Sequence, residues 1–108
     1  EIDLREGDIH TVWTQGWYRA VRILKTDDVG IHFRLYPAGW KERPASISPT
    51  DLERGELNAV GHLPFVRKSF LAMGPKKVSG ASIPVTEEDL DGYRIWEQDK
   101  GGYFGNSD

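Results

Sequence analysis

The sequence predicts a small, bent antiparallel β-barrel that is followed by one or two C-terminal helices. Three observations carry this prediction. Apolar and polar residues alternate in the first half, short turns rich in glycine and aspartate separate the alternating segments, and helical spacing begins only in the second half. A strongly bent meander of short strands usually closes into a barrel. We therefore expect one domain, with a barrel over residues 5–56 and a helical extension over residues 57–108 packed on it.

The first two strands are predicted from the hairpin that joins them. In "GDIHTVWT", Ile9, Thr11 and Trp13 share one face of an alternating segment. "TQG" then reads as a hairpin turn, because Gly16 can adopt the positive φ that such a turn requires. The next segment, "WYRAVRILK", alternates imperfectly, so we expect a β-bulge near residues 20–22 that bends the strand.

The third strand, "GIHFRLY", shows the cleanest alternation in the chain. Its two faces carry, respectively, Ile31, Phe33 and Leu35, and His32, Arg34 and Tyr36. The stretch that follows is rich in proline and glycine. It leaves room for one short strand at residues 45–47 and for a single helical turn within residues 48–55.

Helical patterns appear in the second half of the chain. Apolar spacing predicts a short helix over residues 65–73 and a longer one that starts at Thr86. Thr86 and Asp89 have the separation of a capping box, in which each residue satisfies the backbone of the other. The final helix carries an apolar stripe, which we expect to dock it against the barrel: Leu90, Tyr93 and Trp96.

Composition and charge exclude several classes of protein. The net charge is −3 and no concentrated basic face is present, so nucleic acid is not expected as a partner. The absence of cysteine excludes disulfides and thiolate metal sites, and it suits an intracellular setting, cytoplasmic or nuclear in a eukaryote. No apolar stretch approaches the roughly 20 residues that a membrane helix needs, so no membrane partner is expected.

Several short motifs follow one another between residues 7 and 52. They are Gly7-Asp8, an aromatic strand end at Trp13, "WYRA" at 17–20, "HFRLY" at 32–36, Gly39-Trp40, Glu42 and Asp51-Leu52. In this order and spacing, roughly half of the chain resembles the Tudor family, one branch of the small SH3-like barrels. Each motif is common by itself, so the resemblance depends on their shared order.

The resemblance implies a non-enzymatic recognition module that binds a protein or peptide. Many Tudor domains bind methylated lysine or arginine in an aromatic cage, where a cation that sheds its water cheaply faces several rings. On the matching positions, the rim pocket would be formed by Trp13, Tyr18, Tyr36, Trp40 and Glu42. The alternative is a purely structural role, in which these rings pack in the core, as aromatic residues of small domains usually do.

An acidic segment near the C-terminus supports a different hypothesis. Carboxylates there suit the positive end of a helix, and they can also face a basic partner. Small acidic intracellular inhibitors, such as bacterial immunity proteins that block a basic toxin or enzyme, work in this way. The partner-binding residues would then be Glu87, Glu88, Asp89, Asp91 and Asp99.

No pattern in the sequence indicates catalysis. The three histidines, His10, His32 and His62, lack the spacing of metal ligands, and no glycine-rich phosphate loop or Ser/His/Asp order is present. We therefore expect no enzymatic activity, no metal and no cofactor.

Overall fold

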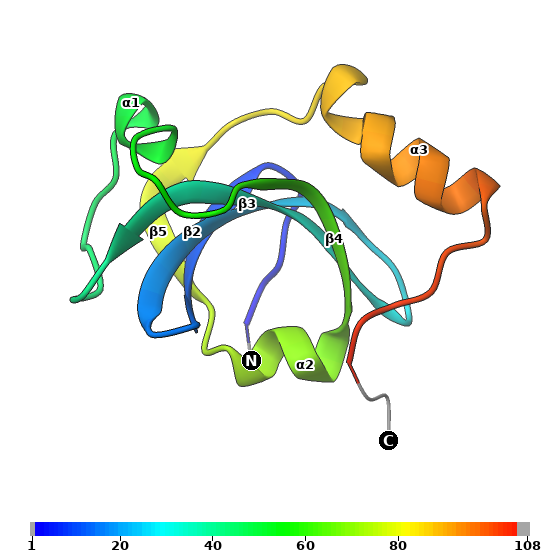
Figure 1. Cartoon of the computed structure of the whole chain (residues 1–108), viewed down its shortest axis with the longest axis horizontal. Helices are drawn as coiled ribbons and strands as arrows, with labels where there is room; N and C mark the ends of the chain where they lie inside the picture. The colour runs from blue at the N-terminus through cyan, green and yellow to red at the C-terminus, as the bar shows by residue number, and fades with distance from the viewer. Residues whose placement is uncertain (1, 106–108) are drawn as a thin grey trace.

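The computed structural model describes residues 2–105, in which five strands form one antiparallel sheet (Figure 1). The strands are β1 (Asp8–Thr14), β2 (Trp17–Thr26), β3 (Gly30–Trp40), β4 (Val60–Val66) and β5 (Lys76–Ser82). Their order across the sheet is β4-β3-β2-β1-β5, so β4 and β5 are the edge strands. The helical segments are α1 (Pro49–Leu52), α2 (Arg67–Ala72), the 3-10 helix η1 (Glu88–Leu90) and α3 (Asp91–Gln98).

The sheet is strongly curved but not closed. Figure 1 shows the strands arching around a shared interior, with α2 lying across the open side. Within residues 2–105, no pairing joins β4 to β5. The mainly β class with a C-terminal helix is thus confirmed, whereas the predicted barrel is not, because the two edge strands do not meet.

The pairing of β2 with β3 is irregular at two points. The register between β2 and β3 shifts twice, between Arg19 and Val21 and between Ile23 and Lys25. At the first shift the extra residues lie on β3, between Leu35 and Gly39, and at the second the extra residue lies on β2, between Ile23 and Lys25. An irregularity is thus present where the bulge was predicted near residues 20–22, but the extra residues there belong to β3 and not to β2. The β1–β2 hairpin is regular, and its turn has positive φ at Gln15 (55°) and Gly16 (84°), as a type I′ turn requires.

Apolar side chains form one cluster on each face of the sheet. The interior cluster consists of Val12, Val21, Ile23, Ile31, Phe33, Leu35 and Phe70 of α2. The cluster on the other face consists of Ile9, Ala20, Tyr36, Leu52 and Val78. The alternation predicted for β3 is therefore present, and it places the Phe33 and Tyr36 rings on opposite faces.

The second half of the chain is less helical than predicted. Residues 45–47 are not a strand, and both edge strands come instead from the region predicted as a helical extension. β4 contains Pro64 and β5 reads "KKVSGAS", so neither has a strong intrinsic preference for a strand. Pairing with β3 and β1 supplies what their sequences lack.

The predicted start and docking face of the last helix are both present. Thr86 N donates to Oδ2 of Asp89 (2.9 Å), and Asp89 N donates to Oγ1 of Thr86 (3.2 Å), which is a capping box. Leu90 is buried, and the rings of Tyr93 and Trp96 contact the sheet. In the described part of the chain, no helix has the length and apolar character needed to cross a membrane.

Candidate functional site

Three of the four rings predicted for the rim lie together at one end of the sheet. Trp13 and Tyr18 are cross-strand partners in the β1–β2 hairpin, and their ring centroids lie 4.8 Å apart in an edge-to-face arrangement. Trp40, at the end of β3, pairs with Tyr18 from the other side. The Trp13 side chain is 46% exposed, whereas Tyr18 and Trp40 are half-buried. These three residues are called the rim below.

Tyr36 does not belong to the rim. It is only 2% exposed, and its hydroxyl accepts a hydrogen bond from Nη1 of Arg22 at 3.2 Å. The Arg34 guanidinium lies 5.0 Å from the centre of its ring. Burial raises the pKa of the Tyr36 hydroxyl. The four-ring cage is therefore not assembled, because Tyr36 is sealed within the cluster that the sheet forms with Leu52 and Val78.

A cation of the chain itself occupies the rim. The Arg43 guanidinium lies 4.8 Å from the centre of the Tyr18 ring. Its Nη1 donates to Oγ1 and O of Thr11 (2.9 and 3.2 Å), and its Nη2 donates to O of Gly74 (3.1 Å). Nearby, Nζ of Lys41 lies 3.8 Å from the ring centre of Trp17, which is half-buried. The predicted acid, Glu42, is exposed beside these groups in sequence.

The five acidic residues of the second hypothesis have different environments. Asp89 is an internal structural group, because its Oδ2 lies 2.6 Å from Nη2 of the buried Arg22. Glu87 forms an exposed ion pair with Arg94 at 3.5 Å. The remaining carboxylates are exposed without an ion pair in the described part of the chain: Glu88, Asp91 and Asp99. An apolar side chain, Ile95, is 60% exposed on the same helix.

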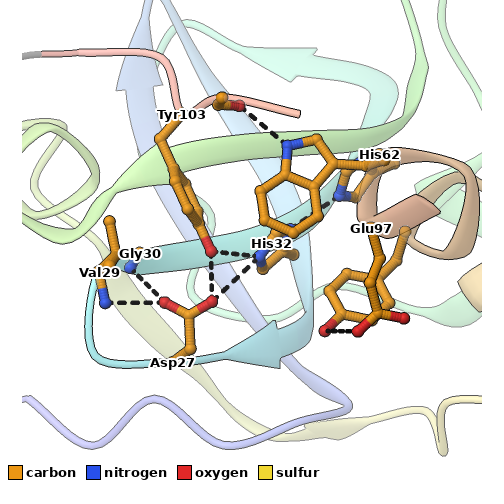
Figure 2. A network of polar contacts seen from close by, with 10 residues as sticks. Asp27, Val29, Gly30, His32, His62, Glu97 and Tyr103 are labelled. Carbon is orange, nitrogen blue, oxygen red and sulfur yellow. Dashed lines mark hydrogen bonds and ion pairs between the residues drawn. The ribbon is translucent and has the colours of Figure 1, made fainter. Parts of the chain in front are cut away.

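The structure also contains a polar cluster that the sequence did not indicate (Figure 2). His32 of β3 lies at its centre, with Nδ1 2.8 Å from Nε2 of His62 and Nε2 2.8 Å from the Tyr103 hydroxyl. The Tyr103 hydroxyl in turn donates to Oδ2 of Asp27. Oδ1 of Asp27 accepts from the backbone N–H groups of Val29 and Gly30, both at 2.8 Å.

One set of neutral rings satisfies every contact in this histidine cluster. Since Asp27 only accepts, Tyr103 donates to it and its oxygen accepts from Nε2–H of His32. Nδ1 of His32 is then an acceptor for Nε2–H of His62. Burial lowers the pKa of His32, and burial together with the neighbouring His32 lowers the pKa of His62 to about 4. Burial would raise the pKa of Asp27, but hydrogen bonds, first of all from Tyr103, outweigh it and lower that pKa.

The histidine cluster attaches the C-terminal segment to the sheet. The rings of Tyr93 and Trp96 lie 4.8 and 4.5 Å from the His32 ring, and Trp96 Nε1 donates to O of Gly102 (2.9 Å). His32 is fully buried beneath them. In residues 2–105, no three His, Asp or Glu side chains are arranged to hold a metal. We assign a structural role to the histidine cluster: it holds α3 against the sheet, and the buried ring of His32 has no access to a substrate.

Sequence reasoning missed the cluster because His62 and Tyr103 are far from Asp27 and His32 in the chain. Asp27, His32, His62 and Tyr103 belong to four different segments, and only the fold brings them together.

Comparisons of the chain with protein-family models, with curated proteins and with solved structures found no match. The resemblance to Tudor domains therefore stays a prediction from the sequence motifs.

Proposed function

We propose that this chain is a non-enzymatic recognition module, a Tudor-like variant of the SH3-like barrel, that binds a protein or peptide through its rim. The ligand group is a cationic side chain, with methylated lysine or arginine as the best candidates. Binding would use the exposed indole of Trp13 first, with Tyr18 and Trp40 beside it. Tyr36 has no part in this proposal, because it is buried.

The observation that carries the proposal is the Arg43 guanidinium above Tyr18. A cation held near the face of an aromatic ring gains about 0.5–2 kcal/mol, depending on how far it is desolvated. Here the distance of 4.8 Å and the neighbouring Trp13 ring give the geometry in which such a gain is realised. A rim that already holds the cation of its own chain has the chemistry to hold that of a partner.

Peptides that carry methylated lysine or dimethylated arginine are expected to bind saturably and to change the tryptophan fluorescence. Trp13→Ala should weaken this binding at least tenfold, because it removes the most exposed ring of the rim. The melting temperature should change little, since the side chain is nearly half exposed. Ile95→Ala, which removes an exposed apolar side chain on α3, is the matched control.

The variant Arg43→Gln tests whether a ligand can take the place of Arg43 at Tyr18 or whether the contact between Arg43 and Tyr18 is purely structural. If ligand and Arg43 compete for Tyr18, the variant should bind the same peptide about three- to tenfold more tightly. Arg54→Gln, at an exposed arginine that pairs with Asp51, controls for the loss of charge. The proposal fails if no methylated peptide saturates the wild type, or if Trp13→Ala binds as the wild type does.

A second proposal, a small acidic inhibitor, is favoured by one feature of α3. An exposed Ile95 lies on a helix flanked by the exposed carboxylates Glu88, Asp91 and Asp99, and interfaces often combine an apolar centre with a charged rim. A basic protein captured by this face should bind more slowly as salt increases. Neutralising Glu88 and Asp91 together should reduce the association rate about tenfold. Binding that is insensitive to both salt and these changes would exclude this alternative.

A further inference from the structure

A groove on the interior side of the sheet is lined in part by a buried arginine, Arg19. The groove has a volume of about 360 Å³ and lies between the β1–β2 turn and β4. Its polar end is formed by Arg19 and Asn58, and its apolar wall includes Leu63, Phe65 and Phe104. Because neighbouring side chains on a strand point to opposite faces, Arg19 lies on the side of β2 opposite to Tyr18 and the rim.

Within residues 2–105, no carboxylate compensates the charge of Arg19. Its side chain is among the most deeply buried of residues 2–105, with 2% exposure, and its Nη2 donates to the carbonyl oxygens of Tyr36 (2.7 Å) and Asn58. Among the described residues, Nε has no hydrogen-bond partner and no carboxylate forms an ion pair with the guanidinium. Burial lowers its pKa. By contrast, the buried Arg22 on the same strand pairs with Asp89.

An uncompensated buried guanidinium is costly, since moving a charge out of water costs several kcal/mol unless an opposite charge and hydrogen bonds replace the water. A fold can carry such a group where a ligand supplies the opposite charge. Nη2 already donates to two carbonyl oxygens, so a carboxylate would accept from the N–H groups of Arg19 that remain, and its full negative charge would offset that of the guanidinium. The apolar wall requires that the rest of the ligand be apolar.

We propose that this groove binds a carboxylate on an apolar stem. The carboxylate pairs with Arg19 beside Asn58, and the stem packs against Leu63, Phe65 and Phe104. The volume of about 360 Å³ lies within the range of small-ligand pockets, so it admits a medium-chain or aryl carboxylic acid, or the last two residues of a peptide. Both sources offer the same chemistry.

The C-terminal segment provides part of the wall. Phe104 N donates to O of Pro64 (2.8 Å), and Val66 N donates to O of Phe104 (2.9 Å), so this residue adds to the outer edge of β4. Its ring lies 5.9 Å from that of Phe65 and is 57% exposed. Figure 1 shows the segment after α3 passing beside the end of β4. A ligand in the groove would cover this exposed ring.

Paired acids and amides test the proposal on the full chain. The first pair of probes is 3-phenylpropionate and its amide. The second pair is the acetylated dipeptide Leu-Phe with a free C-terminal carboxylate and the same dipeptide with a C-terminal amide. We expect each acid to bind at least tenfold more tightly than its amide by calorimetry, and to shift the Arg19 Hε resonance in NMR spectra. The tighter of the two acids identifies the source of the ligand.

Variants distinguish the groove from non-specific binding. Arg19→Gln should abolish the preference for acid over amide, and Phe104→Ala should weaken both acids at least threefold. Phe104 is exposed, so this variant tests the groove even if Arg19→Gln does not fold. Arg54→Gln, the exposed arginine control, should bind like the wild type. Equal binding of acids and amides, or no shift of Arg19 Hε at millimolar acid, would overturn the proposal.

Discussion

Acidification from about pH 6.5 to about pH 4 is expected to reduce the free energy of unfolding through the histidine cluster. The pKa of His62 falls from 6.5 to about 4 in the folded chain, because burial and His32 disfavour the charged ring. The unfolded chain therefore binds this proton first as the pH falls. The stabilisation is complete above about pH 6.5 and is lost progressively towards pH 4. The shift is worth about 3 kcal/mol at most, and about 1–2 kcal/mol when partial access to solvent is considered.

Several charged groups face the cluster and set the limits of this window. Asp27 and Glu97 favour the charged form of His32, but burial outweighs them and its pKa is also lowered. The pKa of Asp27 lies below its ordinary value of 3.8, so the loss of that carboxylate occurs only under more acidic conditions. Between about pH 6.5 and pH 5, the change in stability therefore reports on histidines, whereas below about pH 5 the unfolded chain also protonates Asp27 and Asp89, whose pKa values are lowered in the folded chain.

Urea unfolding at pH 7.0, 5.5 and 4.5, combined with NMR titration of the histidine rings, measures this effect. His62→Gln removes the titrating group and keeps an N–H that can donate to Nδ1 of His32, so its stability should decline less with acid. The remaining decline reflects His32 and His10, whose pKa values burial also lowers. A His62 ring that titrates near pH 6.5, or an unchanged slope in His62→Gln, would contradict the prediction.

Asp89→Ala is expected to lower the free energy of unfolding by about 3 kcal/mol. The change leaves Arg22 buried without its counter-ion, which lies 2.6 Å away in the folded chain, and it also removes the capping box with Thr86. Removing one partner of a buried pair costs more than the pair contributes, because the other charge stays desolvated. Chemical denaturation at neutral pH measures the loss.

Two matched variants isolate the ion pair. Thr86→Ala removes the cap and keeps the pair, so it should cost about 1 kcal/mol. Glu88→Ala, at the exposed neighbouring carboxylate, should cost less than about 0.5 kcal/mol. If Asp89→Ala costs no more than Thr86→Ala, the ion pair has no stabilising role. The result also bears on the inhibitor hypothesis, because a loss of binding in Asp89→Ala would reflect unfolding of this region.

Features encoded over a few neighbouring residues were predictable from the sequence. The alternation in "GIHFRLY" identifies β3 and its two faces, Gly16 marks the hairpin turn, and Thr86 with Asp89 marks the start of the last helical region. Each depends on a local rule of backbone geometry or hydrogen bonding. The edge strands β4 and β5 were missed, because Pro64 and "KKVSGAS" do not favour a strand, and pairing with existing strands determines their conformation.

The fate of individual side chains depended on contacts between distant segments. Alternation places Tyr36 on the face opposite Phe33, as predicted, but it does not reveal that Arg22, Arg34 and the segment after β5 seal that face. Likewise, Arg43 reaches Tyr18 only because the chain folds back after β3.

The sequence by itself therefore determined the strand periodicity, the first hairpin, the helix cap and the aromatic content of the rim. Only the tertiary structure decided which rings stay open, which histidines meet and which arginines find a carboxylate. The physical reason is that periodicity and capping are short-range properties, whereas burial and charge compensation depend on groups that are adjacent in space and remote in the chain.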